Sequence, residues 1–125
     1  MKILVVDDSN AIRTKLARFL QELGHTVVGE ASNGLEAIEQ FKKLNPELVT
    51  MDIVMPECDG VTALSEILKI NSQAKVILIT SAATAANKNS ALEKGALGFV
   101  AKPFVKEKVE QALASIERTH LGKAA

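Results

Sequence analysis

The chain has 125 residues, 47% of them hydrophobic, which suffices for one ordinary domain with a sizeable core. Its 15 basic and 15 acidic side chains give a formal net charge of zero, which disfavours binding to nucleic acid or to an anionic membrane by bulk electrostatics. There is no tryptophan or tyrosine to stack on bases, and no apolar segment approaches the roughly 20 residues that span a bilayer. We therefore expect a soluble, cytoplasmic protein that binds neither nucleic acid nor membranes.

Two strand–helix units come first. A β-branched run over residues 3–6 is followed by four polar residues, which stop a strand and cap a helix. Apolar residues then recur at helical spacing, which predicts a helix of about 14 residues that ends at Gly24. A short strand over residues 26–29 precedes a second amphipathic run, and Pro46 ends this run because proline disfavours helix in the residue before it.

The third unit contains an acidic residue at its centre. An apolar run of strand length begins at Leu48 and stops abruptly at Asp52, and turn-forming residues lead into a helical pattern after Gly60. Asp52 is therefore predicted at the carboxyl end of a buried strand, where ligands bind in open parallel sheets. A carboxylate is costly to bury there unless a nearby group compensates its charge.

The last two strand–helix units include a helix with few bulky apolar residues. The predicted strand over residues 75–80 is almost entirely apolar, as expected when helices cover both faces of a sheet. Residues 81–94 are rich in Ala, Thr, Ser and Asn, so we expect this helix to be the most loosely held element. A short strand over residues 98–101 precedes the last amphipathic run, in which Val105 is the first apolar position.

This alternation of five strands with five helices predicts one α/β domain with a parallel sheet between two layers of helices. We place the domain at residues 1–119 and a short C-terminal tail at residues 120–125.

Polar side chains gather where four of these strands end. They are Asp7 and Asp8 after the first strand, Asp52 after the third, Thr80 at the end of the fourth and Lys102 after the fifth. The carboxyl ends of parallel strands share one crevice. Carboxylates at such short distances raise one another's pKa unless a cation lies between them. Oxygen ligands of this kind suit Mg²⁺. With a lysine as second positive charge, the set favours an anion as ligand, and one carboxylate could attack phosphorus as a nucleophile.

Six short motifs contain or accompany these residues. They are Val6-Asp7-Asp8-Ser9, Asp52-Ile53-Val54-Met55-Pro56, Asp59-Gly60, Thr80-Ser81, Gly95-Ala96 and Lys102-Pro103-Phe104. In this order, the motifs resemble the receiver domains of two-component response regulators over nearly the whole chain. The resemblance implies a flavodoxin-like (βα)5 fold, a doubly wound five-stranded parallel sheet in strand order 2-1-3-4-5 within three α/β/α layers.

The resemblance also implies a phosphoacceptor and a metal site. Asp52 matches the residue that is phosphorylated. Asp8 would ligate Mg²⁺ directly and Asp7 through water, and Asp52 and the backbone carbonyl of Val54 would complete the protein ligands. Mn²⁺ would substitute for Mg²⁺.

Three further residues match the switch of the receiver family. Thr80 would donate its hydroxyl to the phosphoryl group, and Lys102 would pair with Asp52 or with the phosphate. The bond between Lys102 and Pro103 is cis in this family. Phe99 matches the aromatic residue that turns inward when Thr80 moves, and the signal would leave through the fourth helix, fifth strand and fifth helix.

The implied partners are a histidine kinase or phosphotransfer domain, which supplies the phosphoryl group, and a downstream target at that output face. A small phosphodonor could replace the kinase, and the protein would be a monomer or weak dimer that promotes its own phosphorylation and dephosphorylation without being a conventional enzyme. Because the chain is almost nothing but a receiver, it is similar to stand-alone chemotaxis regulators. The alternative is a receiver cut from a longer regulator with an output domain.

Two positions that tune phosphate lifetime in the family are Val54 and Ala82 in this chain. Neither side chain can hydrogen-bond to an attacking water, which predicts a longer phosphate lifetime than in relatives with an amide or acid there.

Two other classes of protein are disfavoured. A haloacid-dehalogenase-like phosphatase has its nucleophile after the first strand in an Asp-x-Asp motif, whereas here two adjacent acids follow that strand. A flavodoxin-like cofactor carrier needs a phosphate-binding loop at the same place, and the two aspartates would repel a flavin phosphate. Taken singly, Asp7 and Asp8 could be helix caps, and Thr80, Phe99 and Lys102 ordinary structural residues.

Overall fold

Five parallel strands form one sheet in a computed structural model that describes the backbone of residues 1–124 and the side chains of residues 1–117. The strands are β1 (Lys2–Val6), β2 (Thr26–Ala31), β3 (Leu48–Met51), β4 (Lys75–Thr80) and β5 (Gly98–Ala101). The helices are α1 (Asn10–Glu22), α2 (Gly34–Leu44), α3 (Gly60–Ile70), α4 (Ala85–Glu93) and α5 (Lys106–Ala124). The strand order β2-β1-β3-β4-β5 confirms the predicted flavodoxin-like topology.

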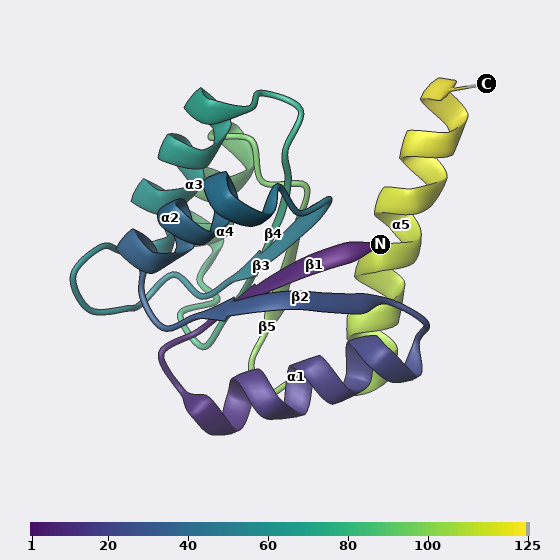
Figure 1. The fold of residues 1–125 in the computed structure, drawn as a ribbon, viewed down its shortest axis with the longest axis horizontal. Coiled ribbons are helices and arrows are strands. Elements are labelled where there is room, and N and C mark those ends of the chain that lie inside the picture. The colour runs from purple at the N-terminus through teal and green to yellow at the C-terminus, as the bar shows by residue number, and fades with distance from the viewer. Residues whose placement is uncertain (125) are drawn as a thin grey trace.

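Helices cover both faces of the sheet. In Figure 1, α1 and α5 lie on one face, and α2, α3 and α4 lie on the other. Alternate residues of each strand supply the two cores, because successive side chains of a strand point to opposite faces. In β1, Ile3 and Val5 belong to the core beneath α1 and α5, whereas Leu4 and Val6 belong to the core beneath the other three helices. The nearly continuous apolar strands in the sequence follow from this double coverage.

The boundaries of several observed elements differ from the predicted ones. Strand β2 extends two residues beyond the prediction, to Ala31, because it pairs with β1 along its length up to Val6. Helix α4 begins at Ala85 rather than at residue 81, because Thr84 caps it and accepts a hydrogen bond from the Asn87 backbone N–H at 3.1 Å.

Val105, predicted as the first apolar position of the last helix, lies outside that helix. Helix α5 begins one residue later, at Lys106, and Val105 is 54% exposed. The backbone of α5 continues to Ala124, and the side chains of residues 118–125 lie outside the described residues. The predicted domain boundary at residue 119 stays a prediction.

A buried hydroxyl in the central strand β3 provides a test of the core. The Thr50 Oγ1 atom is buried without a hydrogen-bond partner among the described residues. Its neighbours across the sheet are Val5 and Ile77. We expect Thr50→Val, which keeps the shape and removes the hydroxyl, to raise the free energy of unfolding by about 1 kcal/mol.

Urea denaturation followed by circular dichroism measures this change. The exposed Thr62 of α3 supplies a matched control, because Thr62→Val should change stability by less than about 0.5 kcal/mol. A loss of stability in the Thr50 variant would show that the hydroxyl has a partner, such as a buried water.

Helix α4 has little to hold it in place. Of its nine residues, only Ala91 is buried. An isolated helix needs about 12 to 15 residues to persist in water, so α4 depends on packing that it largely lacks. By contrast, α3 buries four residues, Gly60, Ala63, Leu64 and Ile67.

We therefore predict that the free energy of opening measured by amide exchange is at least about 2 kcal/mol lower in α4 than in α3. Amide hydrogen exchange resolved by residue measures both values in one sample. Slow, core-like exchange across residues 84–94 is the result that would contradict the prediction.

Candidate functional site

Three carboxylates meet at the carboxyl ends of β1 and β3. These strands are hydrogen-bonded neighbours in which Val6 pairs with Met51, so the next residues, Asp7 and Asp52, lie side by side. The Asp52 backbone N–H donates to the Val6 carbonyl at 3.2 Å, which continues the pairing past the strand ends. Asp7, Asp8 and Asp52 each offer a carboxylate oxygen, and these atoms lie within 4.8 Å of one another.

Asp7 is held at both its backbone and its side chain. Its N–H donates to the Ala31 carbonyl on β2 at 3.0 Å. Its Oδ1 accepts a hydrogen bond from the Ser9 N–H at 2.9 Å, and the Ser9 hydroxyl in turn caps α1. The Asp7 side chain is therefore buried in one orientation, whereas the neighbouring Asp8 is exposed.

Asp52 is buried and depends on a close approach by Gly60. Its Oδ1 accepts a hydrogen bond from the Val54 N–H at 3.3 Å. The first residue of α3, Gly60, donates its N–H to the Ile53 carbonyl at 2.8 Å. A β-carbon at Gly60 would overlap the backbone carbonyl of Asp52, so this helix start accommodates only glycine without displacing Asp52.

Lys102 joins the two buried carboxylates. Its Nζ donates to Asp7 Oδ2 at 2.6 Å and to Asp52 Oδ2 at 2.9 Å, and its side chain is only 14% exposed. Its backbone N–H donates to the Thr80 carbonyl at 2.9 Å, and the following bond to Pro103 is cis, as the resemblance implied. Burial alone lowers the pKa of Lys102, but the hydrogen bonds and negative charges of Asp52 and Asp7 outweigh it and raise this pKa above its usual value of 10.5.

The remaining predicted residues lie around this cluster. Thr80 is fully buried at the end of β4, and its Oγ1 accepts a hydrogen bond from the Ala82 N–H at 3.1 Å. Phe99 of β5 is partly buried against the core beneath α2, α3 and α4. Val54 is 62% exposed, and its backbone N–H faces Asp52. The structure thus joins Asp7, Asp52 and Lys102 directly, whereas the Thr80 hydroxyl bonds to its own loop.

Arg13 is a residue that the sequence analysis gave no role. Its Nη1 donates to the backbone carbonyl of Asp7 at 2.6 Å, and its Nε donates to Glu30 Oε1 at 3.0 Å. A helical side chain leans toward the N-terminus of its helix, so an arginine in the second turn of α1 can reach the preceding loop. No local pattern in the sequence marked this contact.

The donor set fits a hard divalent cation. All three candidate ligands are carboxylates, and the single lysine leaves the cluster with excess negative charge. Mg²⁺ prefers oxygen ligands, usually takes one or two protein carboxylates and keeps several waters. The exposed Asp8 beside the buried Asp7 and Asp52 leaves room for such waters on one side.

The sequence matches a known protein family over most of its length. Residues 3–114 match the family model described as the response regulator receiver domain. The chain is 40% identical over 117 residues to the chemotaxis protein CheY of Thermotoga maritima, covering 94% of this chain and 98% of that protein. It is 44% identical over 108 residues to a protein-glutamate methylesterase/protein-glutamine glutaminase of Alkalilimnicola ehrlichii, covering 83% of this chain and 27% of that protein.

A solved structure is similar over nearly the whole chain. It is the CheX-CheY-BeF3-Mg complex from Borrelia burgdorferi, which superposes with a TM-score of 0.90 at 34% identity and covers 93% of this chain and 88% of that one. The family match, the sequence identity and the shared fold together show that this chain belongs to the response regulator receiver domain family.

Proposed function

We propose that this chain is a signalling switch that receives a phosphoryl group on Asp52 in a Mg²⁺-dependent reaction. The observation that carries the proposal is the double hydrogen bond of the Lys102 ammonium to Asp7 and Asp52 inside the cluster of three carboxylates. A nucleophilic oxygen, ligands for a divalent cation and a fixed positive charge then lie at one place. These are the parts that phosphoryl transfer requires of a protein.

The chain's own groups account for the transfer step. A carboxylate oxygen of Asp52 attacks phosphorus, a new P–O bond forms, and the bond between phosphorus and the donor breaks with its electron pair leaving on the donor. The donor is a histidine kinase, a phosphotransfer domain or a small acyl phosphate. Asp8, Asp7, Asp52 and the Val54 carbonyl would hold Mg²⁺, which neutralises charge on the phosphoryl oxygens.

Lys102 and Thr80 have complementary roles in this proposal. Lys102 bonds to Asp52 before the reaction and is placed to move to a phosphoryl oxygen afterwards. The Thr80 Oγ1 now accepts a hydrogen bond from the Ala82 N–H, so its own proton is available for donation to the phosphoryl group. A hydrogen bond from the Thr80 hydroxyl to a phosphoryl oxygen would draw Thr80 and its loop toward the site and leave space for Phe99.

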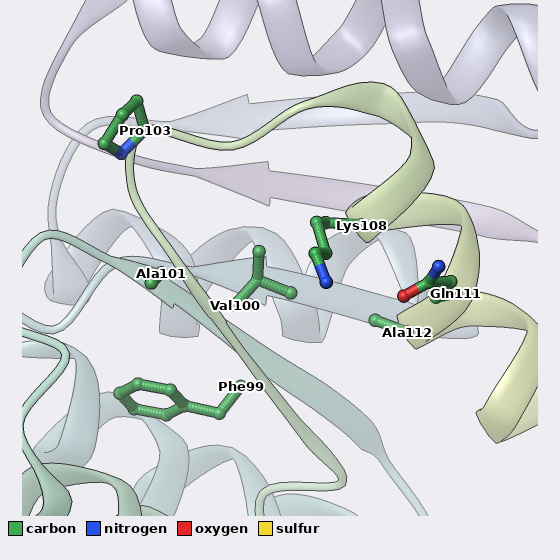
Figure 2. Close-up of a pocket in the computed structure, with 7 residues that line it drawn as sticks. All are labelled: Phe99, Val100, Ala101, Pro103, Lys108, Gln111 and Ala112. Atoms are coloured by element: carbon green, nitrogen blue, oxygen red, sulfur yellow. The ribbon is translucent and has the colours of Figure 1, made fainter.

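The proposed output surface lies over α4, β5 and α5. A pocket of about 560 Å³ opens between β5 and α5. Its lining residues are Phe99, Val100, Ala101, Pro103, Lys108, Gln111 and Ala112. Figure 2 shows Lys108 and Gln111 on α5, with the Phe99 ring directed away from that helix. A change in the position of Phe99 would alter this surface and with it the affinity for a downstream target.

The similarity to CheY proteins favours a stand-alone, chemotaxis-like regulator in the cytoplasm, present as a monomer or weak dimer. The second candidate is the receiver part of a longer regulator, because the Alkalilimnicola relative contains such a domain in just 27% of its length. No helix in the described residues has both the length and the apolar character needed to cross a membrane.

Intact mass measurement after incubation with acetyl phosphate and Mg²⁺ tests the proposal. We expect one labile phosphoryl group on the wild-type chain, none on Asp52→Asn, and none when a chelator removes Mg²⁺. Asp59→Asn is the matched control, because it removes the same charge from a helix cap and keeps capping ability. Steady release of phosphate over many turnovers would instead indicate a phosphatase, and absence of phosphate on the wild type would refute the proposal.

Phosphate lifetime gives a further prediction. Neither the Val54 nor the Ala82 side chain can orient a water for attack on phosphorus. We therefore expect Ala82→Glu to shorten the lifetime of the phosphoryl group about tenfold. A well-positioned general base contributes more than this to a rate. Ala82→Val, which adds bulk without an acceptor, should not shorten the lifetime. The decay of the phosphorylated mass after removal of donor measures both. A wild-type half-life of seconds would contradict this interpretation.

A further inference from the structure

Arg13 connects three elements around the acidic cluster. Its guanidinium donates to the Asp7 carbonyl at 2.6 Å, to Glu30 Oε1 on β2 at 3.0 Å and to Asn10 Oδ1 at the start of α1 at 3.1 Å. The Arg13 side chain is only 15% exposed. Planar guanidinium groups with several satisfied donors hold their partners in fixed directions, which a single lysine ammonium does not.

The bond to Asp7 determines the direction of the peptide between the two adjacent acids. The Asp7 carbonyl belongs to the peptide group that leads into Asp8, and the Asp7 N–H is already held by Ala31 on β2. Hydrogen bonds thus hold the peptide groups on both sides of Asp7. The exposed Asp8, by contrast, has no comparable restraint on its side chain among the described residues beyond the peptide that Arg13 orients.

We propose that Arg13 is a positioning residue for the cation site: it orients the Asp7–Asp8 peptide so that both carboxylates face the same ion as Asp52, and Glu30 orients Arg13. The inference rests on the proposed function, because it concerns the divalent cation of that site. Arg13 bonds to the Asp7 backbone carbonyl and would itself touch neither the ion nor the phosphoryl group.

Replacing Arg13 removes both a positive charge and an orienting contact, and these two losses have opposite effects on Mg²⁺ affinity. Removal of a nearby positive charge strengthens the attraction between a divalent cation and the carboxylates. Loss of an orienting contact weakens binding, because the ligands must then be ordered when the ion binds. We expect the second effect to dominate, so that Arg13→Ala weakens Mg²⁺ binding roughly tenfold, the low end for residues that orient metal ligands.

Isothermal titration calorimetry of the full chain with MgCl₂, well below the melting temperature of each variant, gives the dissociation constants. Arg13→Lys keeps the charge and one donor, so it should recover part of the lost affinity. Arg18→Ala removes the same charge from an exposed position on the same helix and should not weaken binding. The Ser9 amide, which donates to Asp7 Oδ1, should shift in the NMR spectrum of Arg13→Ala before metal is added.

A second pair of variants keeps the inference testable if Arg13→Ala does not fold. Glu30 and Glu36 line the same small pocket, but only Glu30 bonds to Arg13, whereas Glu36 accepts hydrogen bonds from Ser32 and Asn33. Each alanine variant loses one negative charge, so the two variants should differ only through the contact between Glu30 and Arg13. We expect Glu30→Ala to bind Mg²⁺ more weakly than Glu36→Ala.

Equal or tighter Mg²⁺ binding by Arg13→Ala, or equal binding by the two glutamate variants, would overturn the inference. Failure of the wild-type chain to bind Mg²⁺ at millimolar concentration would refute the proposed function instead, so the two failures are distinguishable.

Discussion

Replacing Lys102 by methionine is expected to lower the free energy of unfolding by about 3 kcal/mol at neutral pH in metal-free buffer, as for a broken buried ion pair. The reason is that the ammonium lies 2.6 Å from Asp7 and 2.9 Å from Asp52, whose side chains are 4% and 6% exposed. Without the lysine, two buried carboxylates face each other with no cation between them. Methionine keeps an unbranched apolar chain, so the change reports mainly on the lost charge.

Magnesium should recover part of this stability. In the variant, a bound divalent ion becomes the main counter-charge for the three carboxylates, so saturating Mg²⁺ should stabilise the variant more than the wild type. Urea denaturation followed by circular dichroism, with chelator and with Mg²⁺, measures both effects. The gap in stability between the two proteins is expected to narrow when Mg²⁺ is present.

The control for charge and length is Lys106→Met. The Lys106 ammonium lies 3.8 Å from Glu22, and both side chains are well exposed, so the loss should be below about 0.5 kcal/mol. Equal losses for the two variants would show that the buried position of Lys102 is irrelevant. Because the folded-state pKa of Lys102 lies above 10.5, its contribution is complete at neutral pH and is lost as pH rises through the alkaline range.

Gly60→Ala is expected to cost about 3 kcal/mol in stability, the upper range for overpacking, and to abolish Mg²⁺ binding at millimolar concentrations. A β-carbon at Gly60 would overlap the Asp52 carbonyl and would lie 2.9 Å from the Ile53 Cα atom. Both neighbours are backbone, so neither can rotate away. Either α3 or the loop after β3 must shift, and the Asp52 carboxylate shifts with that loop.

Gly24→Ala separates this steric effect from the general cost of replacing glycine. Gly24 has a φ of +92°, and a β-carbon there would meet nothing within 4 Å. Its replacement should cost about 1 kcal/mol through the backbone conformation alone. Because Gly24 lies at the opposite end of the sheet from Asp52, Mg²⁺ binding should be unchanged. Magnesium titrations and urea denaturation of both variants test the contrast, and tight Mg²⁺ binding by Gly60→Ala would contradict it.

Local patterns in the sequence were sufficient to predict the order and type of the elements. Strands β4 and β5 occupy the residues predicted for them, because turn residues and glycine bound each apolar run. The end of β2 depends on a contact between distant residues, whereas the start of α4 depends on a local cap, Thr84. Strand β2 gains two residues by pairing with β1, and Val105 lies just before α5, where its carbonyl accepts a hydrogen bond from the Lys108 N–H.

The sequence by itself determined which chemical groups lie at the carboxyl end of the sheet, because an abrupt change from apolar to acidic residues marks the end of a strand. Only the tertiary structure decided how these groups pair. Lys102 lies 95 residues from Asp7 and 50 from Asp52, yet binds both. The support of Asp7 by Arg13 and the packing of Gly60 on Asp52 likewise depend on strand register, helix placement and side-chain rotamers. No local pattern encodes these distances, because they are set when the helices pack on the sheet.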